Sequence, residues 1–295
     1  MKEIVIISGK GGTGKTSITA AFAALANKEA VLADCDVDAA DMHLLLAPTA
    51  RHTHPFYSGH RAEIVAANCS QCGKCVPLCR FDAITSGPDI KIIPSACEGC
   101  GVCVHECPQN AITFNEQRCG EWYQSDTRFG SLVHARLDIG AENSGKLVSL
   151  VRKEARNLAL AEQRELILVD GPPGIGCPVI ASITGADVVC IITEPTCSGQ
   201  HDLQRLLALT KHFEIPTFLT VNKWDINPEM TATIQQEALK QGVKLLGTIP
   251  YDSEVTAAQV AAQTVVERGD NSAALAITVA WNNLYKHLKL INTTP

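Results

Sequence analysis

Short apolar runs alternate with amphipathic stretches along most of the chain. Ile4–Ile7 and Ala30–Ala33 are apolar at every position, which is typical of strands buried on both faces of a parallel sheet. Similar runs occupy 165–170, 187–193, 216–221 and 245–251. Helical periodicity falls between them, at 17–28, 141–162, 199–213, 253–265 and 271–289. The pattern predicts an α/β fold with a doubly wound, mainly parallel sheet.

Two further strands are predicted in the first half of the chain. Alternating polarity marks 61–66, and an apolar run marks 132–137. The intervening polar stretch 48–60 is predicted to be a connecting loop. Its histidines, His52, His54 and His60, are irregularly spaced, which favours surface positions over a metal site.

A glycine-rich segment follows the first apolar run directly. From Gly9 to Thr16 its spacing is G-x-x-x-x-G-K-[ST], the phosphate-binding loop. Glycines let successive backbone N–H groups turn toward a phosphate. Lys15 supplies a charge for the β and γ phosphates, and the Thr16 hydroxyl can ligate Mg²⁺. The predicted nucleotide site comprises Gly9, Gly11, Gly12, Thr13, Gly14, Lys15, Thr16 and Ser17.

Acidic residues follow two other apolar runs. Asp34 and Asp36 come after 30–33, and Asp170 ends 165–170, ahead of Gly174. Carboxylates at the carboxyl ends of parallel strands, beside a phosphate loop, lie where Mg²⁺ and the attacking water are held. Asp170 therefore occupies the Walker B position, and Gly174 is a candidate sensor of the γ-phosphate.

Residues 64–115 differ sharply in composition from the rest. They contain two copies of C-x₂-C-x₂-C-x₃-C, the run that binds 4Fe-4S clusters in bacterial ferredoxins. In proteins with two such runs, the fourth cysteine of each run ligates the other cluster. One cluster is therefore assigned Cys69, Cys72, Cys75 and Cys107, and the other Cys97, Cys100, Cys103 and Cys79.

The cysteine runs also set the predicted domain organisation. A small α+β ferredoxin domain, 64–115, is inserted into a P-loop domain formed by 1–63 and 116–295. Zinc is the competing ligand for any C-x-x-C pair, but two identical four-cysteine runs favour iron–sulfur clusters. Arg80 departs from the ferredoxin pattern, which has proline there, and removes no ligand.

The phosphate loop carries an additional lysine, Lys10. Lys10 to Thr16 matches the K-G-G-x-G-K-[ST] variant of the ParA/MinD family of P-loop ATPases, which this sequence resembles. The resemblance implies that Lys10 reaches the partner's nucleotide in a homodimer formed on ATP binding. It also matches Asp34 and Asp36 to the family's acidic pair, with Asp36 orienting the attacking water.

The segment that starts at Asn222 bears on base recognition. Asn222-Lys-Trp-Asp225 fits N-K-x-D, which reads guanine in GTPases, whereas in the ParA/MinD family the matching asparagine faces adenine. The resemblance also places Pro250 near the base. Lys10 favours ATP, and GTP stays open. Candidate catalytic residues are then Lys10, Lys15, Asp36 and Asp170, with Thr16, Asp34 and Asp170 around Mg²⁺.

Composition limits the partners and the compartment. The net charge of −6 gives no electrostatic reason to expect nucleic acid or an anionic membrane surface. No apolar run is long enough to cross a bilayer, and the first strand leaves no room for a signal peptide. We therefore expect a cytoplasmic protein, in which thirteen cysteines favour metal binding over disulfides.

The sequence most closely resembles MinD-like ATPases with an inserted ferredoxin domain, and three functions follow from it. The leading hypothesis is an ATP-hydrolysing switch coupled to electron transfer, through both clusters, to an unknown redox or client protein. A second is an iron–sulfur carrier of the Mrp type, although no C-x-x-C lies outside 64–115. A third is a partner-recruiting switch whose clusters are only structural.

Overall fold

The centre of the sheet consists of three strands that are buried on both faces. A computed structural model describes residues 1–141 and 144–291 of the protein. Strand β1 (Lys2–Ser8) lies between β6 (Leu166–Pro173) and β7 (Val188–Thr193) and is parallel to both. Side chains on these strands, such as Ile4, are fully buried. The uninterrupted apolar runs in the sequence reflect this burial on both faces.

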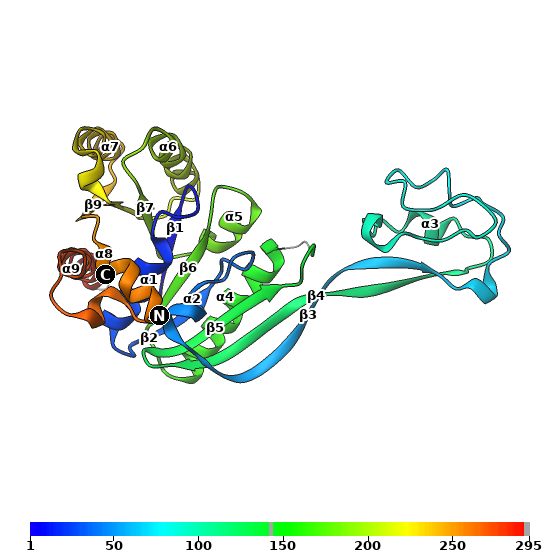
Figure 1. Cartoon of the computed structure of the whole chain (residues 1–295), viewed down its shortest axis with the longest axis horizontal. Coiled ribbons are helices and arrows are strands. Elements are labelled where there is room, and N and C mark those ends of the chain that lie inside the picture. The colour runs from blue at the N-terminus through cyan, green and yellow to red at the C-terminus, as the bar shows by residue number, and fades with distance from the viewer. Residues whose placement is uncertain (142–143, 292–295) are drawn as a thin grey trace. The chain divides into compact units, whose positions relative to one another are not determined.

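In the described part of the chain, nine strands form one sheet, ordered β3-β4-β5-β2-β6-β1-β7-β8-β9 (Figure 1). The remaining parallel strands are β2 (Ala30–Asp34), β5 (Gly130–Leu137), β8 (Thr217–Asn222) and β9 (Lys244–Ile249). At one edge lie β3 (Thr49–Ile64) and β4 (Ile112–Thr127). The mainly parallel α/β sheet predicted from the sequence is confirmed.

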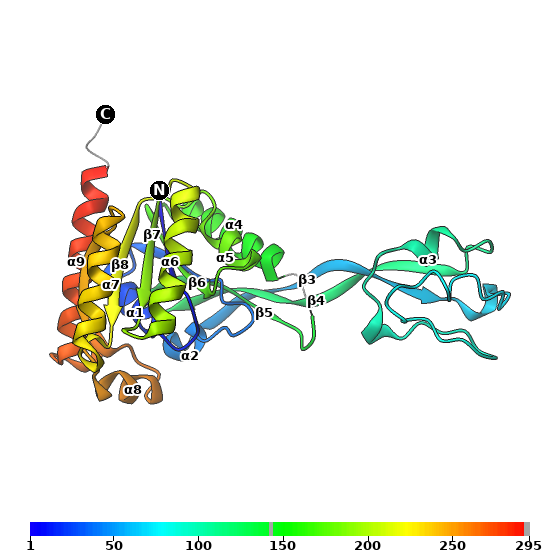
Figure 2. The same ribbon diagram turned by 90° about the horizontal axis from the view of Figure 1, so that it is seen from above.

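Helices cover both faces of the sheet, as Figures 1 and 2 show. On one face α1 (Lys15–Ala26) packs against α9 (Ser272–Ile291), and the ring centroids of Phe22 and Trp281 are 5.3 Å apart. On the other, α4 (Ser144–Ala161) packs against α5 (Cys177–Ile183). Helices α2 (Met42–Leu46), α6 (Cys197–His212), α7 (Pro228–Lys240) and α8 (Ser253–Val260) complete this layer structure.

Several local predictions were wrong. The expected loop at 48–60 is most of β3, an edge strand whose side chains are largely exposed. No side chain is buried over residues 49–55, so this part of the strand shows no alternation of polarity, and the alternation noted at 61–66 marks only its end. The helix expected at 253–265 ends at Val260, and Ala262 has a left-handed φ of 51°. Helices α2, α5 and α7 were not predicted.

Contacts divide the chain into two compact units. The first comprises Met1–His54, Glu121–Leu137 and the chain from Ser144 onward. The second comprises Pro55–Gly120 with the segment that begins at Asp138, and the predicted insertion 64–115 lies inside it. Among the described residues, no helix combines the length and apolar character needed to span a bilayer.

The second unit contains little regular structure besides the strand ends of β3 and β4. Among its described residues are one short helix, α3 (Val102–His105), and two 3₁₀ turns, Ala66–Asn68 and Pro94–Ala96. Its buried apolar side chains are few, and half of them are small: Phe56, Ala62, Ala83, Ile84, Ile90, Ala111, Ile112 and Cys119. A core of this size stabilises a fold weakly.

Candidate nucleotide site and cysteine cavities

The phosphate-binding loop connects β1 to α1. The strand ends at Ser8 and the helix begins at Lys15, so residues 9–14 form the connection. Gly14 has a φ of 85°, and a Cβ there would lie 2.5 Å from Nδ2 of Asn222. Backbone conformation and lack of space therefore both require glycine at this position. The helix starts directly at the loop, which directs its N-terminal N–H groups toward the cavity.

A cavity of about 730 Å³, including space open to solvent, lies beside this loop. Of the predicted site residues, it is lined by Gly11, Gly12, Thr13, Gly14, Lys15, Thr16, Ser17 and Asp36. Gly9, Lys10, Asp34, Asp170, Asn222 and Pro250 do not line this cavity. Five further residues line the cavity and were not among the predicted site residues: Ser8, Ala39, Asp41, Pro173 and Gln259. The amide of Gln259 donates to Ser17 Oγ at 2.8 Å.

Lys15 is the centre of a buried ionic group. Its Nζ lies 2.9 Å from Oδ1 of Asp170 and 3.6 Å from Oδ2 of Asp36. Burial acts to lower the pKa of Lys15, but the charges of Asp170 and Asp36 outweigh it and raise the pKa overall. Thr16 donates to Asp170 at 2.7 Å, and Thr19 donates to the same carboxylate at 3.0 Å.

The two acids after β2 are held differently. Asp34 is fully buried and accepts backbone N–H bonds from Asp36 and Met42 at 3.1 and 3.2 Å. Burial, with the charge of Asp170, raises the pKa of Asp34 well above its usual range. Asp36 faces the cavity, and burial raises its pKa to about 6 although Lys15 opposes the shift. Asp34 thus shapes the segment that presents Asp36.

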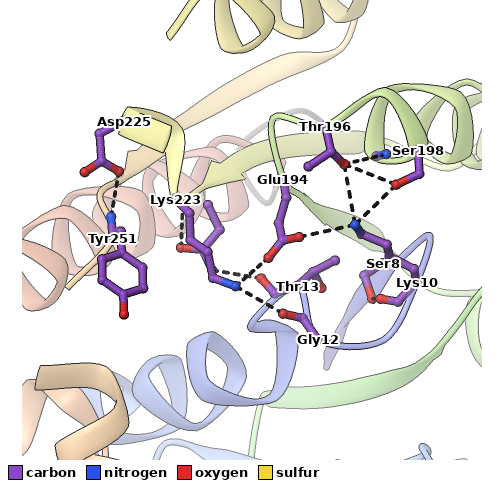
Figure 3. A network of polar contacts seen from close by, with 12 residues as sticks. Ser8, Lys10, Gly12, Thr13, Glu194, Thr196, Ser198, Lys223, Asp225 and Tyr251 are labelled. Atoms are coloured by element: carbon purple, nitrogen blue, oxygen red, sulfur yellow. Dashed lines mark hydrogen bonds and ion pairs between the residues drawn. The ribbon is translucent and has the colours of Figure 1, made fainter. Parts of the chain in front are cut away.

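The segment Asn222–Asp225, called the base-side segment below, is attached to the phosphate loop by hydrogen bonds. Asn222 donates from Nδ2 to the carbonyl of Thr13 at 2.8 Å and accepts the N–H of Lys223 at 3.0 Å. Lys223 donates to the carbonyl of Gly12 at 3.3 Å. Asp225 accepts the N–H of Tyr251 at 2.7 Å, which joins this segment to the residue after Pro250 (Figure 3).

Two residues of this region were not predicted from the sequence. Thr19 is one helical turn beyond Lys15 and could have been found from that spacing. Glu194 follows β7 and forms ion pairs with both Lys10 and Lys223 (Figure 3). Its role depends on segments distant in sequence, so no local pattern indicates it.

Two cavities in the second unit are each lined by four cysteines. The first, about 350 Å³ including space open to solvent, is bordered by Cys69, Cys72, Cys75 and Cys107. The second, about 290 Å³, is bordered by Cys79, Cys97, Cys100 and Cys103. In each, three cysteines come from one run and the fourth comes from the other. Apolar side chains complete both walls, including Ile64 and Ile90 in the first and Phe81 and Ile84 in the second.

The thiols of the two runs differ in their surroundings. The backbone N–H of Ala111 donates to Sγ of Cys107 at 3.3 Å, and a hydrogen bond from the Lys74 backbone lowers the pKa of Cys72. Burial raises the pKa of Cys75, as do the neighbouring Cys69, Cys72 and Cys107. Hydrogen bonds to cysteine sulfur are among the means by which proteins tune iron–sulfur clusters.

The loop that carries the second run is fixed by a close backbone approach. Gly99, with a φ of 62°, lies against the carbonyl of His60, where a Cβ would be 2.1 Å from that oxygen.

Among the described residues, no three His, Cys, Asp or Glu side chains converge on a point as ligands of a single ion would. The eight thiols instead surround two spaces, and a 4Fe-4S cluster takes four cysteine thiolates. The residues present fit such a group.

The other cysteines occupy varied positions. Cys35, Cys119 and Cys190 are buried, whereas Cys177 and Cys197 are exposed at the starts of α5 and α6. The thiol of Cys119 donates to the carbonyl of Ser58 at 3.0 Å. His52, His54 and His60 are exposed, which confirms their predicted surface positions.

Comparison with known proteins accounts for the geometry of the phosphate loop. Residues 4–265 match the CobQ/CobB/MinD/ParA nucleotide binding domain. The chain belongs to this family. Membership confirms the P-loop NTPase resemblance drawn from Lys10 to Thr16. The family match concerns the nucleotide-binding domain and does not describe the cysteine cavities.

Individual relatives extend along most of the chain. MJ0578 of Methanocaldococcus jannaschii, an uncharacterized protein, is 35% identical over 255 residues, which are 86% of each chain. MJ0547 of the same organism, an uncharacterized ATP-binding protein, is 26% identical over 289 residues, 93% of this chain and 84% of that protein. MinD of Pyrococcus horikoshii, solved with Mg-ADP, matches with a TM-score of 0.59 and 17% identity over 98% of both chains. At that identity the likeness is one of fold.

Proposed function

We propose that the protein is a Mg²⁺-dependent ATPase that forms a homodimer on binding ATP and couples this switch to electron transfer. The observation that carries the proposal is the presence, in one chain, of a phosphate-loop cavity and two four-cysteine cavities. The name of MJ0547 as an ATP-binding protein supports ATP over GTP. The acceptor is a redox or client protein that the chain does not identify, and nucleic acid and membranes are not among the proposed partners.

In the nucleotide site, each side chain has a distinct part. Lys15 and the loop N–H groups hold the β and γ phosphates, and Thr16 and Asp170 hold Mg²⁺, with Asp34 behind them. Asp36 lies at the cavity wall, where it can orient the water that attacks the γ-phosphate. Asn222 supports the loop from the base side, near Pro250. Lys10 acts on the nucleotide of the second copy.

In the inserted domain, the eight cysteines hold two 4Fe-4S clusters, which supply one-electron chemistry when bound. Cys69, Cys72, Cys75 and Cys107 surround one, and Cys97, Cys100, Cys103 and Cys79 surround the other. The crossed fourth ligands join the two halves of a unit whose own core is small. Apolar side chains form part of each wall, whereas Cys72 and Cys100 are exposed to solvent. This arrangement supports a ferredoxin-like domain at 64–115, inserted in the ATPase formed by 1–63 and 116–295.

The test is an oxygen-free preparation with iron, sulfide and zinc counted per chain. We expect roughly eight iron atoms and a 4Fe-4S electron paramagnetic resonance signal after reduction. Zinc in place of iron would refute the redox function and leave the nucleotide switch. With clusters present, electron transfer to an artificial acceptor is measured with ATP, with ADP and without nucleotide. Equal rates in all three conditions would refute the coupling and favour structural clusters.

A further inference from the structure

Glu194 lies between two lysines from different segments. It follows β7, and its side chain is 13% exposed. Nζ of Lys223 is 2.5 Å from Oε1, and Nζ of Lys10 is 3.4 Å from Oε2. Figure 3 shows both lysines reaching this carboxylate from two sides. A single acid therefore connects the phosphate loop to the base-side segment.

Lys10 is held loosely by this arrangement. Besides Glu194, its Nζ contacts the hydroxyls of Thr196 at 3.4 Å and Ser198 at 3.3 Å, both near the outer limit of a hydrogen bond. Ser8 donates to the Lys10 carbonyl at 2.9 Å. This bond fixes the backbone of Lys10 and does not restrain its side chain. The side chain is 35% exposed and does not line the nucleotide cavity of its own chain.

Lys223 is held more firmly than Lys10. Its pair with Glu194 is shorter, and the same Nζ donates to the carbonyl of Gly12. If Lys10 moves away from Glu194, the carboxylate still forms its shorter ion pair with Lys223. The negative charge of this largely buried carboxylate therefore stays paired. The arrangement thus lets Lys10 depart while the acid and the base-side segment stay in place.

We propose that Glu194 is a positioning residue that holds Lys10 on its own subunit until the nucleotide of a second copy attracts it. The idea rests on the proposed dimer, in which Lys10 reaches across to that nucleotide. A triphosphate carries more negative charge than one carboxylate that is already shared with Lys223, so it outcompetes Glu194 for the ammonium group. Glu194 would then set how much ATP is needed to close the dimer.

The contact itself is tested in the nucleotide-free protein. An amine-reactive reagent is added in limiting amount, and the labelling rate of Lys10 is measured by peptide mass spectrometry. In Glu194→Gln we expect Lys10 to be labelled about two- to fivefold faster, the factor that one partly exposed ion pair implies. Lys240 on α7 serves as an internal reference. An unchanged rate at Lys10 would overturn the proposal whether or not the protein dimerises.

The consequence is tested by light scattering with a slowly hydrolysed ATP analogue. Glu194→Gln should dimerise at an analogue concentration about two- to fivefold lower than the unaltered protein. The difference should vanish when Lys10→Ala is combined with it. The matched control is Glu237→Gln, which removes an acid that accepts from Gln200 and Gln204 at 2.8 Å.

The outcomes separate the two proposals. If the unaltered protein stays monomeric with saturating nucleotide, the proposed dimer is wrong, and the labelling rate still decides whether Glu194 holds Lys10. If the unaltered protein dimerises but Glu194→Gln does so no more readily, the holding role is wrong and the proposed function stands. A shift in Glu237→Gln equal to that in Glu194→Gln would also overturn it, because general loss of negative charge would explain both.

Discussion

Lys15 is 5% exposed and Asp170 is fully buried, so each charge depends on the other for compensation. Asp36 lies near enough to Lys15 to share that charge, and Thr16 and Thr19 satisfy the remaining oxygen positions of Asp170. A substitution in this group therefore affects folding as well as chemistry, because it leaves a buried group unpaired. Both effects have to be measured to assign a role.

Substitution of Thr16 or Asp170, the two residues proposed to hold Mg²⁺, should abolish ATP hydrolysis. The two substitutions should lower the free energy of unfolding by different amounts. Thr16→Ala deletes the 2.7 Å bond to Asp170 and a longer contact of 3.5 Å with Nζ of Lys15, and it should lower the free energy of unfolding by about 1 kcal/mol. Asp170→Ala leaves the buried Lys15 charge with the weaker influence of Asp36 and Asp34 and should lower the free energy of unfolding by about 3 kcal/mol. Urea unfolding and phosphate release, each with Mg²⁺ and with chelator, provide the measurements. Substantial Mg²⁺-dependent turnover in Thr16→Ala would contradict the assignment.

His134 is a second residue whose environment controls its charge. Burial, together with the charge of His43, lowers its pKa to about 4. Its ring stacks on Tyr123 with centroids 4.9 Å apart, and its Nε2 lies 3.0 Å from Ser125 Oγ. A cavity of about 740 Å³, including space open to solvent, adjoins it and is bordered among others by Asp38, Asp41 and Arg136. The folded protein therefore keeps His134 neutral where the unfolded chain protonates it.

Stability should fall with acidification in a way that depends on His134. The unfolded histidine titrates near 6.5 and the folded one near 4, so the unfolded state binds the extra proton between these values. The loss begins below pH 6.5 and reaches at most about 3 kcal/mol. His134→Gln should flatten unfolding free energies measured at pH 7, 6 and 5. Asp36, with a pKa of about 6, titrates in the same range in the unaltered protein and in His134→Gln. The difference between their two pH profiles of unfolding free energy therefore reports on His134. Parallel pH profiles would contradict the prediction.

At the scale of elements, the site is assembled where strands end. Loops after β1, β2, β6, β7 and β8 meet at the carboxyl edge of the sheet, the usual ligand position in open α/β sheets. Asn222, at the end of β8, binds the phosphate loop that follows β1. The end of one strand thereby fixes the conformation of a loop on another.

Asn222→Ala should weaken nucleotide binding through this link. The variant loses the bonds to the Thr13 carbonyl and the Lys223 N–H, and the nucleotide dissociation constant should rise about tenfold, the factor that roughly 1.4 kcal/mol implies. The matched control is Asn283→Ala, which removes a 2.8 Å bond from Nδ2 to the Leu246 carbonyl. The control should lose similar stability and keep its nucleotide affinity, both measured by calorimetry. Equal affinities in the two variants would refute the link.

At the scale of the whole molecule, the chain combines a large α/β unit with a small unit of loops. The large unit has an extensive apolar core on both faces of its sheet. The small unit has few buried apolar side chains, so its stability should depend on what the cysteines bind. Loss of the bound group should therefore unfold the small unit before the large one.

Single cysteine variants should separate the two cavities. Cys107→Ser should lose the same cluster signal as Cys72→Ser, and Cys79→Ser the same as Cys100→Ser, because the fourth ligands cross between the runs. Iron should fall from roughly eight to roughly four atoms per chain in each variant. Cys119→Ser, outside both cavities, is the control and should keep all iron. If Cys107→Ser instead affected the signal lost in Cys100→Ser, the crossed assignment would be wrong.

The sequence by itself determined the features that are set locally. The phosphate loop follows from backbone sterics within Gly9–Thr16, and the cysteine runs follow from how closely spaced thiols can converge. Unbroken apolar runs in the sequence indicated the fully buried strands, because both faces of these strands lie against other elements. The P-loop fold and the two four-cysteine sets could be predicted on this basis.

The tertiary structure decided what depends on residues far apart in the chain. Asp170 pairs with Lys15 across 155 positions, and Glu194 lies between Lys10 and Lys223 only because three loops meet at one edge of the sheet. Strand β3 is polar, so only its pairing at the edge of the sheet makes it a strand. Local sequence patterns indicate which side chains are buried. Which distant segments contact each other is determined by how the helices and strands pack.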